Sequence, residues 1–293
     1  MKQPKGIILA LICLGLILSI ASQSLQASSK VDRKLDYQVI ERSQYKIHVV
    51  TIPQGANYQI KPVIAGDLQP ISKFVQANTV AIINGGYFDP VNQKTTSFMV
   101  ERGQIIGDPR FNERLVDNPD LKRYLRKIFN RAEFRRYNCP NSIQYDIQPH
   151  SAPIPKDCTL SDSLGGGPGL LPENSSVAEG FLAYQNGSKI RDAIGNDSLN
   201  ARSGVGITAD GSVILVMVAQ DRDRPLNSGI SLPDLAAEMS DLGAAKAMNL
   251  DGGSSASLYY GDRAIFGRVD REGNPVIRPI KSVLSVTANL GEE

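Results

Sequence analysis

The chain has 293 residues, of which 41% are hydrophobic and 21% are charged, and this is the composition of an ordinary globular protein. The formal net charge is only +2, so the overall charge favours neither nucleic acid nor an acidic membrane as a partner. No zinc-finger spacing or RNA-binding signature is found either. These features argue against a nucleic-acid-binding protein and leave enzymes and binding proteins open.

The N-terminus has the layout of an export signal. Lys2 and Lys5 precede an almost wholly apolar run over residues 6–20, and small and polar residues follow, with Leu25-Gln26-Ala27 as the expected cleavage site. The run is shorter than the roughly 20 residues that span a bilayer. We therefore expect residues 1–27 to be a signal peptide, with an uncleaved anchor as the alternative. A polar linker is expected over residues 28–36. The expected location is outside the cytoplasm, with membrane contact only through an uncleaved N-terminal segment.

The chain after the linker begins with four strand-like runs. They are rich in Val and Ile and are bounded by Pro, Gly and Asn. Their ranges are residues 46–52, 58–64, 79–83 and 97–100.

Residues 108–160 have a different character and are expected to form an insertion. Between Arg110 and Arg136 the basic residues outnumber the acidic ones, and apolar residues such as Leu125 and Ile128 recur at helical spacing. This pattern predicts a basic amphipathic helix followed by a loop. The helix would present either a solvated face or a surface that attracts an anionic polymer.

The predicted loop holds the two cysteines that remain once the signal is removed. Cys139 and Cys158 form an even pair in an exported chain, which favours a disulfide over two free thiols. Such a bridge contributes about 3 kcal/mol. A zinc site is disfavoured, because His48 and His150 are the only histidines in the sequence.

The second half of the chain alternates strands with one helix. Asp210-Gly211 is a favoured hairpin turn between strands at 204–208 and 213–219. Ser231 is a typical N-cap for a helix over residues 232–243. Further strands are predicted at 247–250, 258–260 and 282–288. We therefore expect one α/β (α+β) domain over residues 37–293, with a mixed β-sheet core, flanking helices and the insertion at about 108–160.

The main chemical candidate is Asp251, which follows a predicted strand and precedes two glycines and two serines. This arrangement is either a tight turn or a carboxylate at the edge of a sheet, with backbone that a ligand can approach closely. Asp221 also follows a predicted strand, and the fork of Arg202 suits a phosphate group. A serine hydrolase is disfavoured because Ser254 has no suitably placed histidine base.

Four short motifs and the helix before the last of them resemble one known family. The motifs are Asn-Gly-Gly-Tyr-Phe at 84–88, Gly-Gly-Pro-Gly-Leu at 166–170, Ala-Arg-Ser-Gly-Val-Gly at 201–206 and Asn-Leu-Asp-Gly-Gly-Ser-Ser at 249–255. In this order over roughly residues 78–290 they resemble the phosphodiester glycosidase family. The basic segment and the cysteine pair depart from the pattern of the family.

The resemblance implies an exported hydrolase that cleaves a sugar-1-phosphodiester bond in a surface or secreted glycan. It implies a catalytic group in which Arg202 binds phosphate, Asp251 is the base or nucleophile and Asp221 is a second carboxylate. It also implies a set of substrate-binding residues, which are Asn84, Gly85, Gly86, Tyr87, Gly167, Gly252, Gly253, Ser254 and Ser255.

No cofactor is demanded by these residues, although a divalent cation between Asp221, Asp251 and phosphate is compatible with them. The alternative to an enzyme is a non-catalytic glycan-binding protein of exopolysaccharide biosynthesis or export. The sequence has no Trp to stack on sugars, but its 10 Tyr and 8 Phe residues could replace it.

Overall fold

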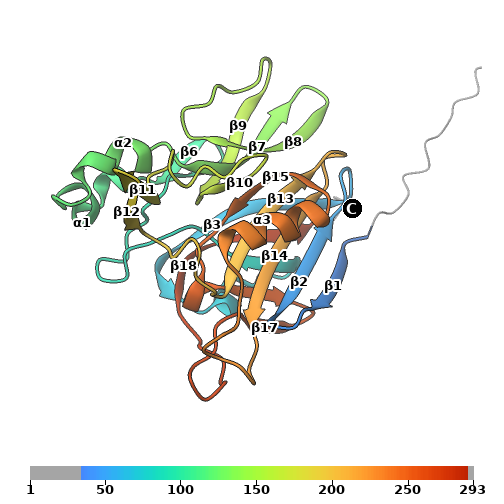
Figure 1. Cartoon of the computed structure of the whole chain (residues 1–293). Coiled ribbons are helices and arrows are strands. Elements are labelled where there is room, and N and C mark those ends of the chain that lie inside the picture. The colour runs from blue at the N-terminus through green and yellow to red at the C-terminus, as the bar shows by residue number, and fades with distance from the viewer. Residues whose placement is uncertain (1–33, 290–293) are drawn as a thin grey trace, which may run out of the picture. The chain divides into compact units, whose positions relative to one another are not determined.

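The computed structural model describes residues 34–289. The expected signal peptide or anchor lies outside these residues, as does most of the expected linker, whose last residue begins the first strand. The strands form three antiparallel sheets and one separate hairpin (Figure 1). None of the helices in this part of the chain is long and apolar enough to cross a bilayer.

The first sheet is centred on β14, in which all eight residues are buried. Its apolar sequence fits this place, because the neighbouring strands and the layers on both faces exclude water. The N-cap Ser231 begins helix α3 (Leu232–Asp241), and Leu235 and Met239 of this helix pack against one face of the sheet. The strands, in spatial order, are β1 (Asp36–Glu41), β2 (Tyr45–Ile52), β14 (Val213–Gln220), β13 (Arg202–Thr208), β15 (Ala244–Asn249) and β10 (Gly169–Leu171).

The second sheet packs against the other face of the first. Val50 and Leu215 of the first sheet belong to the same core cluster as Ile83 and Leu284 of the second. The short helix η1 (Ile71–Phe74) covers the opposite face. The strands, in spatial order, are β17 (Arg263–Phe266), β16 (Ser257–Tyr260), β4 (Thr79–Asn84), β18 (Ile280–Ala288) and β3 (Tyr58–Gln69).

The third sheet contains much of the segment that the sequence assigned to an insertion. Met99, Phe134 and Leu164 from this sheet join the same central core cluster, so its strands are part of the domain core. The strands, in spatial order, are β6 (Gln104–Gly107), β5 (Met99–Glu101), β9 (Thr159–Gly165), β7 (Ala132–Cys139) and β8 (Ser142–Pro149).

The basic amphipathic helix predicted between Arg110 and Arg136 is not confirmed. The chain forms short helical turns as far as residue 128 and then enters β7, where Arg135 and Arg136 are buried. Arg135 donates to Glu133 at 3.0 Å, and Arg136 to Asp162 at 3.0 Å. The helical turns are η2 (Pro109–Phe111), α1 (Glu113–Val116), η3 (Lys122–Tyr124) and α2 (Leu125–Ile128).

The α/β class therefore fits only loosely. Strands predominate, each pairing between the named strands is antiparallel, and α3 is the one helix of more than four residues among residues 34–289. The remaining elements are the hairpin β11 (Leu182–Gln185) and β12 (Ser188–Asp192), and the turn η4 (Gly253–Ser255).

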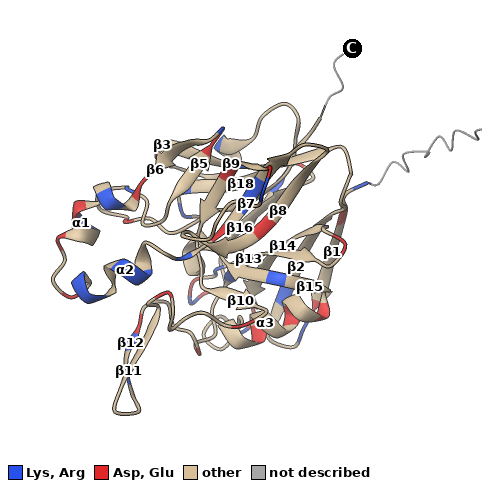
Figure 2. Cartoon of the chain, turned by 90° about the horizontal axis from the view of Figure 1, so that it is seen from above, with Lys and Arg blue, Asp and Glu red and all other residues tan. Residues whose placement is uncertain are grey.

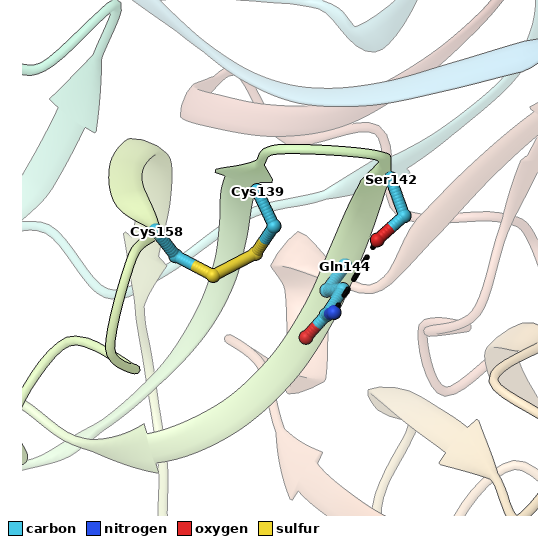
Figure 3. Close-up of a disulfide and its surroundings, with 4 residues drawn as sticks. All are labelled: Cys139, Ser142, Gln144 and Cys158. Carbon is cyan, nitrogen blue, oxygen red and sulfur yellow. Dashed lines mark hydrogen bonds between the residues drawn. A yellow bond between two sulfur atoms is a disulfide. The ribbon is translucent and has the colours of Figure 1, made fainter.

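The predicted disulfide between Cys139 and Cys158 is confirmed. Cys139 ends β7 and Cys158 lies just before β9, with Cα atoms 4.3 Å apart (Figure 3). Nearby, the Gln144 side chain donates to the Ser142 hydroxyl across 3.3 Å. The bridge closes a loop from the end of β7 to the start of β9 that contains β8, and so restrains the outer part of the third sheet.

Replacing both cysteines by serine should lower the free energy of unfolding by about 3 kcal/mol, because the unfolded chain loses a constraint on its loop. Urea unfolding of Cys139→Ser/Cys158→Ser and of the parent measures this loss. Reductant should destabilise the parent equally and leave the double variant unchanged. An equal response of the two proteins to reductant would contradict the prediction.

Candidate active site

The candidate site forms where the chain leaves β15 and reaches the end of β4. The Asp251 amide donates to the Gly85 carbonyl at 3.0 Å. In return, Nδ2 of Asn84 donates to the Asp251 carbonyl at 2.6 Å. These two hydrogen bonds fix the backbone at Asp251, although the two segments are 167 positions apart in the chain.

Asn84 is completely buried and joins the first two sheets. Its Oδ1 accepts from the hydroxyl of Ser203 in β13 at 2.6 Å and from the amide of Ser257 in β16 at 3.0 Å. With both ends of its side-chain amide engaged within the protein, Asn84 supports the site from behind and does not line it.

Asp251 lies at a cavity of about 280 Å³ on the other side of this support. The cavity combines one carboxylate with three guanidinium groups, backbone from a glycine turn and several polar side chains. Its lining residues are Tyr87, Ile194, Asn200, Arg202, Asp251, Gly252, Gly253, Ser254, Arg268 and Arg278.

The Asp251 carboxyl has an unusual protonation equilibrium. Its desolvation raises the pKa from 3.8 to about 6, while the Ser255 hydroxyl, the Arg278 charge and the Gly252 amide act in the opposite direction. At neutral pH the group is therefore mainly ionised and is more basic than an ordinary carboxylate. Such a group in a cavity is suited to proton abstraction or to nucleophilic attack.

Arg202 reaches the cavity but is largely engaged by the backbone. Nε donates to Ile230, Nη1 to Ile194, and Nη2 to Gly195 and Ser198, all through carbonyl oxygens at 2.5–3.4 Å. Of the five N–H groups of a guanidinium, one is left for a ligand. Arg202 therefore holds the loop over residues 194–200 in place as well as adding positive charge to the cavity.

Arg268 and Arg278 were not identified from the sequence, yet both line the cavity with Asp251. Arg278 donates to the Ser254 hydroxyl at 2.9 Å, and Arg268 donates to Asn200 at 2.9 Å. Within the described chain neither forms an ion pair with a carboxylate. The only sequence feature that marks Arg278 is its place between two prolines before the last strand, and no sequence feature marks Arg268 as part of the site.

Tyr87 forms a partly buried wall of the cavity. Its hydroxyl donates to the Gly167 carbonyl at 2.8 Å and accepts from Nδ2 of Asn249 at 2.6 Å. Desolvation raises the pKa of Tyr87 far above its usual range, so the phenol stays protonated. Tyr87 therefore shapes the cavity and is not a base.

The other glycines of the motifs permit close packing of backbone. A Cβ at Gly86 would overlap the Gly165 carbonyl, and a Cβ at Gly167, where φ is +95°, would overlap the Glu179 carboxylate. These positions lie behind the cavity. Of the predicted binding residues, Tyr87, Gly252, Gly253 and Ser254 line it, whereas Asn84, Gly85, Gly86, Gly167 and Ser255 are not among the lining residues.

Asp221 is not brought to this cavity. It lines another cavity, of about 380 Å³, together with Lys46 and His48. Its carboxylate accepts from the Asp223 amide at 3.0 Å and pairs with Arg224 at 3.4 Å. Asp221 and Asp251 are therefore not placed to share a cation. In the part of the chain that the structure describes, no three His, Cys, Asp or Glu residues gather as a metal site.

Comparison with solved structures shows the same fold in two proteins. A hypothetical protein from Synechocystis aligns with a TM-score of 0.55 and 16% identity, over 87% of this chain and 62% of that one. The catalytic domain of zebrafish N-acetylglucosamine-1-phosphodiester alpha-N-acetylglucosaminidase, auto-inhibited by its pro-peptide, aligns with a TM-score of 0.60 and 15% identity, over 87% of this chain and 82% of that one. Thus the present chain spans less than two thirds of the Synechocystis protein.

No match is found among proteins with curated descriptions. The family model of phosphodiester glycosidases matches residues 77–287. This range covers most of the chain and includes each residue that lines the Asp251 cavity. The chain therefore belongs to the phosphodiester glycosidase family.

Proposed function

We propose that this protein is an exported hydrolase that cleaves the bond between the anomeric carbon of a sugar and a phosphate oxygen in a surface or secreted glycan. The observation that carries the proposal is the cavity in which the Asp251 carboxylate faces Arg268 and Arg278. Membership of the family supports the reaction class. The disulfide and the signal-like N-terminal sequence support export.

The chemistry of the leaving group explains why one carboxylate suffices. A glycosidase that releases an alcohol usually needs a carboxylic acid to protonate it. Here the leaving group is a phosphate monoester, whose second pKa is about 6, so it departs readily without a strong acid. The demands on the site are to balance the growing phosphate charge and to supply an attacking group.

Arg278 and Arg268 meet the first demand. Their guanidinium groups have no carboxylate partner among the described residues, and a guanidinium can bind two phosphate oxygens at once. Arg202 contributes charge and one remaining donor while it holds the loop at 194–200. The negative charge on phosphate grows as the C–O bond breaks, so these contacts strengthen in the transition state.

Asp251 meets the second demand. As a base it takes a proton from water, which attacks the anomeric carbon and inverts its configuration. As a nucleophile it forms a glycosyl ester, which water then hydrolyses with retention. Both routes require the ionised carboxylate, and both release the sugar and a phosphate monoester.

Asp251→Asn should lower kcat by at least about 100-fold, since the amide keeps the shape but cannot act as base or nucleophile. In the parent, kcat/KM should fall about tenfold per unit as the pH drops below about 6, because the raised pKa makes protonation inactivating there. A panel of sugar-1-phosphodiesters with detection of free sugar measures both effects.

A control for this experiment is Asp221→Asn, which should retain activity because Asp221 lines a different cavity. If Asp251→Asn folds normally and keeps near-full activity, the assigned role of Asp251 is wrong. If the parent binds the compounds and cleaves none of them, the glycan-binding alternative replaces the enzyme.

Arg278→Ala should raise KM and lower kcat, with a combined loss in kcat/KM of about 100-fold, because a phosphate contact that strengthens in the transition state is removed. Arg271→Ala is a matched control, since this exposed arginine lies in the preceding loop and does not line the cavity. Equal kinetics of the two variants would remove Arg278 from the site.

A further inference from the structure

A second basic groove lies beside the candidate site. It has a volume of about 500 Å³ and is formed where residues 119–124, which lie between the short helices α1 and α2, approach strand β12 of the β11–β12 hairpin. The helices and the hairpin lie side by side at one end of the domain in both views (Figures 1 and 2). The lining residues are Pro119, Asp120, Arg123, Tyr124, Ile190 and Arg191.

Two guanidinium groups share a single aromatic ring in this groove. The Cζ atoms of Arg123 and Arg191 lie 4.9 and 4.6 Å from the centroid of Tyr124. Arg191 also donates through Nε to the Gly180 carbonyl at 2.7 Å, which fixes its position. Neither arginine forms an ion pair within residues 34–289, although Asp120 lines the same groove.

This arrangement is suited to an anion. Two like charges held against one ring repel each other, and a bound phosphate would offset that repulsion while accepting from both groups. The ring supports the guanidinium planes through cation–π contacts and leaves their edges free to donate.

The groove is connected to the Asp251 cavity through a short stretch of chain. Ile194 lies three residues after Arg191, lines that cavity, and accepts from Arg202 through its carbonyl. Between the two sites, buried Arg131 stacks on Phe181 at 3.8 Å. Desolvation, with the nearby charge of Arg191 adding to it, lowers the pKa of Arg131 to about 10.

The same guanidinium of Arg131 lies 6.0 Å from the ring of Tyr87, which forms the wall of the cavity. Arg131 is therefore a buried cation between the arginines of the groove and the cavity, with aromatic rings beside it and the Glu179 carboxyl nearby. A ligand with a single charged group would use the cavity alone. A ligand with regularly spaced charges would use both.

We propose that the groove at Tyr124 is an anion subsite, which binds a second phosphate group of a substrate that carries repeated sugar phosphodiesters. The inference rests on the proposed hydrolysis at Asp251 and specifies the substrate as a polyanionic glycan. The groove holds the neighbouring repeat while the terminal linkage lies in the cavity.

The test compares one substrate that reaches the groove with one that does not. An oligosaccharide with at least three sugar-1-phosphate repeats is compared with a single sugar-1-phosphodiester of the same sugar. Arg123→Ala/Arg191→Gln should raise KM about tenfold for the oligosaccharide and leave both kinetic constants for the single phosphodiester unchanged. Lys122→Ala/Arg126→Ala removes the same charge outside the groove and should change neither.

A binding measurement distinguishes a wrong subsite from a wrong assignment of the protein as a hydrolase. The oligosaccharide is titrated into Asp251→Asn with and without the groove substitutions, and the substitutions should weaken binding about tenfold even if no preparation cleaves it. Absence of cleavage together with this loss of binding would reject the hydrolase and keep the subsite. Equal binding by the groove variant and the control variant would overturn the subsite.

If the double variant does not fold, the affinity of Arg123→Ala alone for the oligosaccharide tests the proposal. The Arg123 side chain is exposed and makes no hydrogen bond to other described residues, so its removal should not disturb folding. It should weaken binding of the oligosaccharide about threefold, and an unchanged affinity would likewise overturn the proposal.

Discussion

The structure depends on how one buried amide joins two sheets. Asn84 ends β4, and its side chain connects this strand to β13, to β16 and to the backbone of Asp251. Leaving such a group unpaired in the core would cost about 1–3 kcal/mol for each lost partner. The requirement to satisfy Asn84 therefore determines where the turn after β15 lies, and with it the position of the catalytic candidate.

The residues that support the cavity are therefore different from the residue assigned to the reaction. Asn84, Gly85 and Gly167 lie behind the cavity, where hydrogen bonds and close backbone packing set its shape. Asp251 stands in front of them, desolvated enough to raise its pKa to about 6 while arginines face it. A carboxylate that is costly to ionise and arginines without an ion-pair partner among the described residues are both unfavourable for folding alone. Both are explained if a phosphodiester occupies the cavity.

The sequence predicted most strands of the first two sheets, because their apolar and β-branched runs are bounded by turn residues, but it missed β1, β10 and β17. β2, β4 and β14 lie within one or two residues of the predicted ranges, and the Ser231 cap correctly marked the start of α3. The prediction failed at β7, because the helix inferred from apolar residues at helical spacing was extended over residues that form this strand. Arg135 is buried there because Glu133 and backbone carbonyls contact it, and such partners cannot be read from local periodicity.

The site was predicted only in part for a similar reason. Asp251 and Arg202 converge because β15 and β13 are paired neighbours in the first sheet. Asp221 also follows a strand, but its carboxylate is engaged in a local turn and faces another cavity. Arg268 and Arg278 come from a loop without periodicity, and their approach to Asp251 depends on how residues 267–279 cross the ends of the strands.

In the proposed reaction the bond that breaks joins the anomeric carbon of the sugar to a phosphate oxygen, and Asp251 directs attack at that carbon. Hydrolysis of a sugar-1-phosphodiester in ¹⁸O-labelled water, followed by mass spectrometry of both products, distinguishes attack at carbon from attack at phosphorus. Attack at carbon should place the label in the released sugar and none in the phosphate monoester. Label in the phosphate would show attack at phosphorus and would contradict the assignment of the protein as a glycosidase.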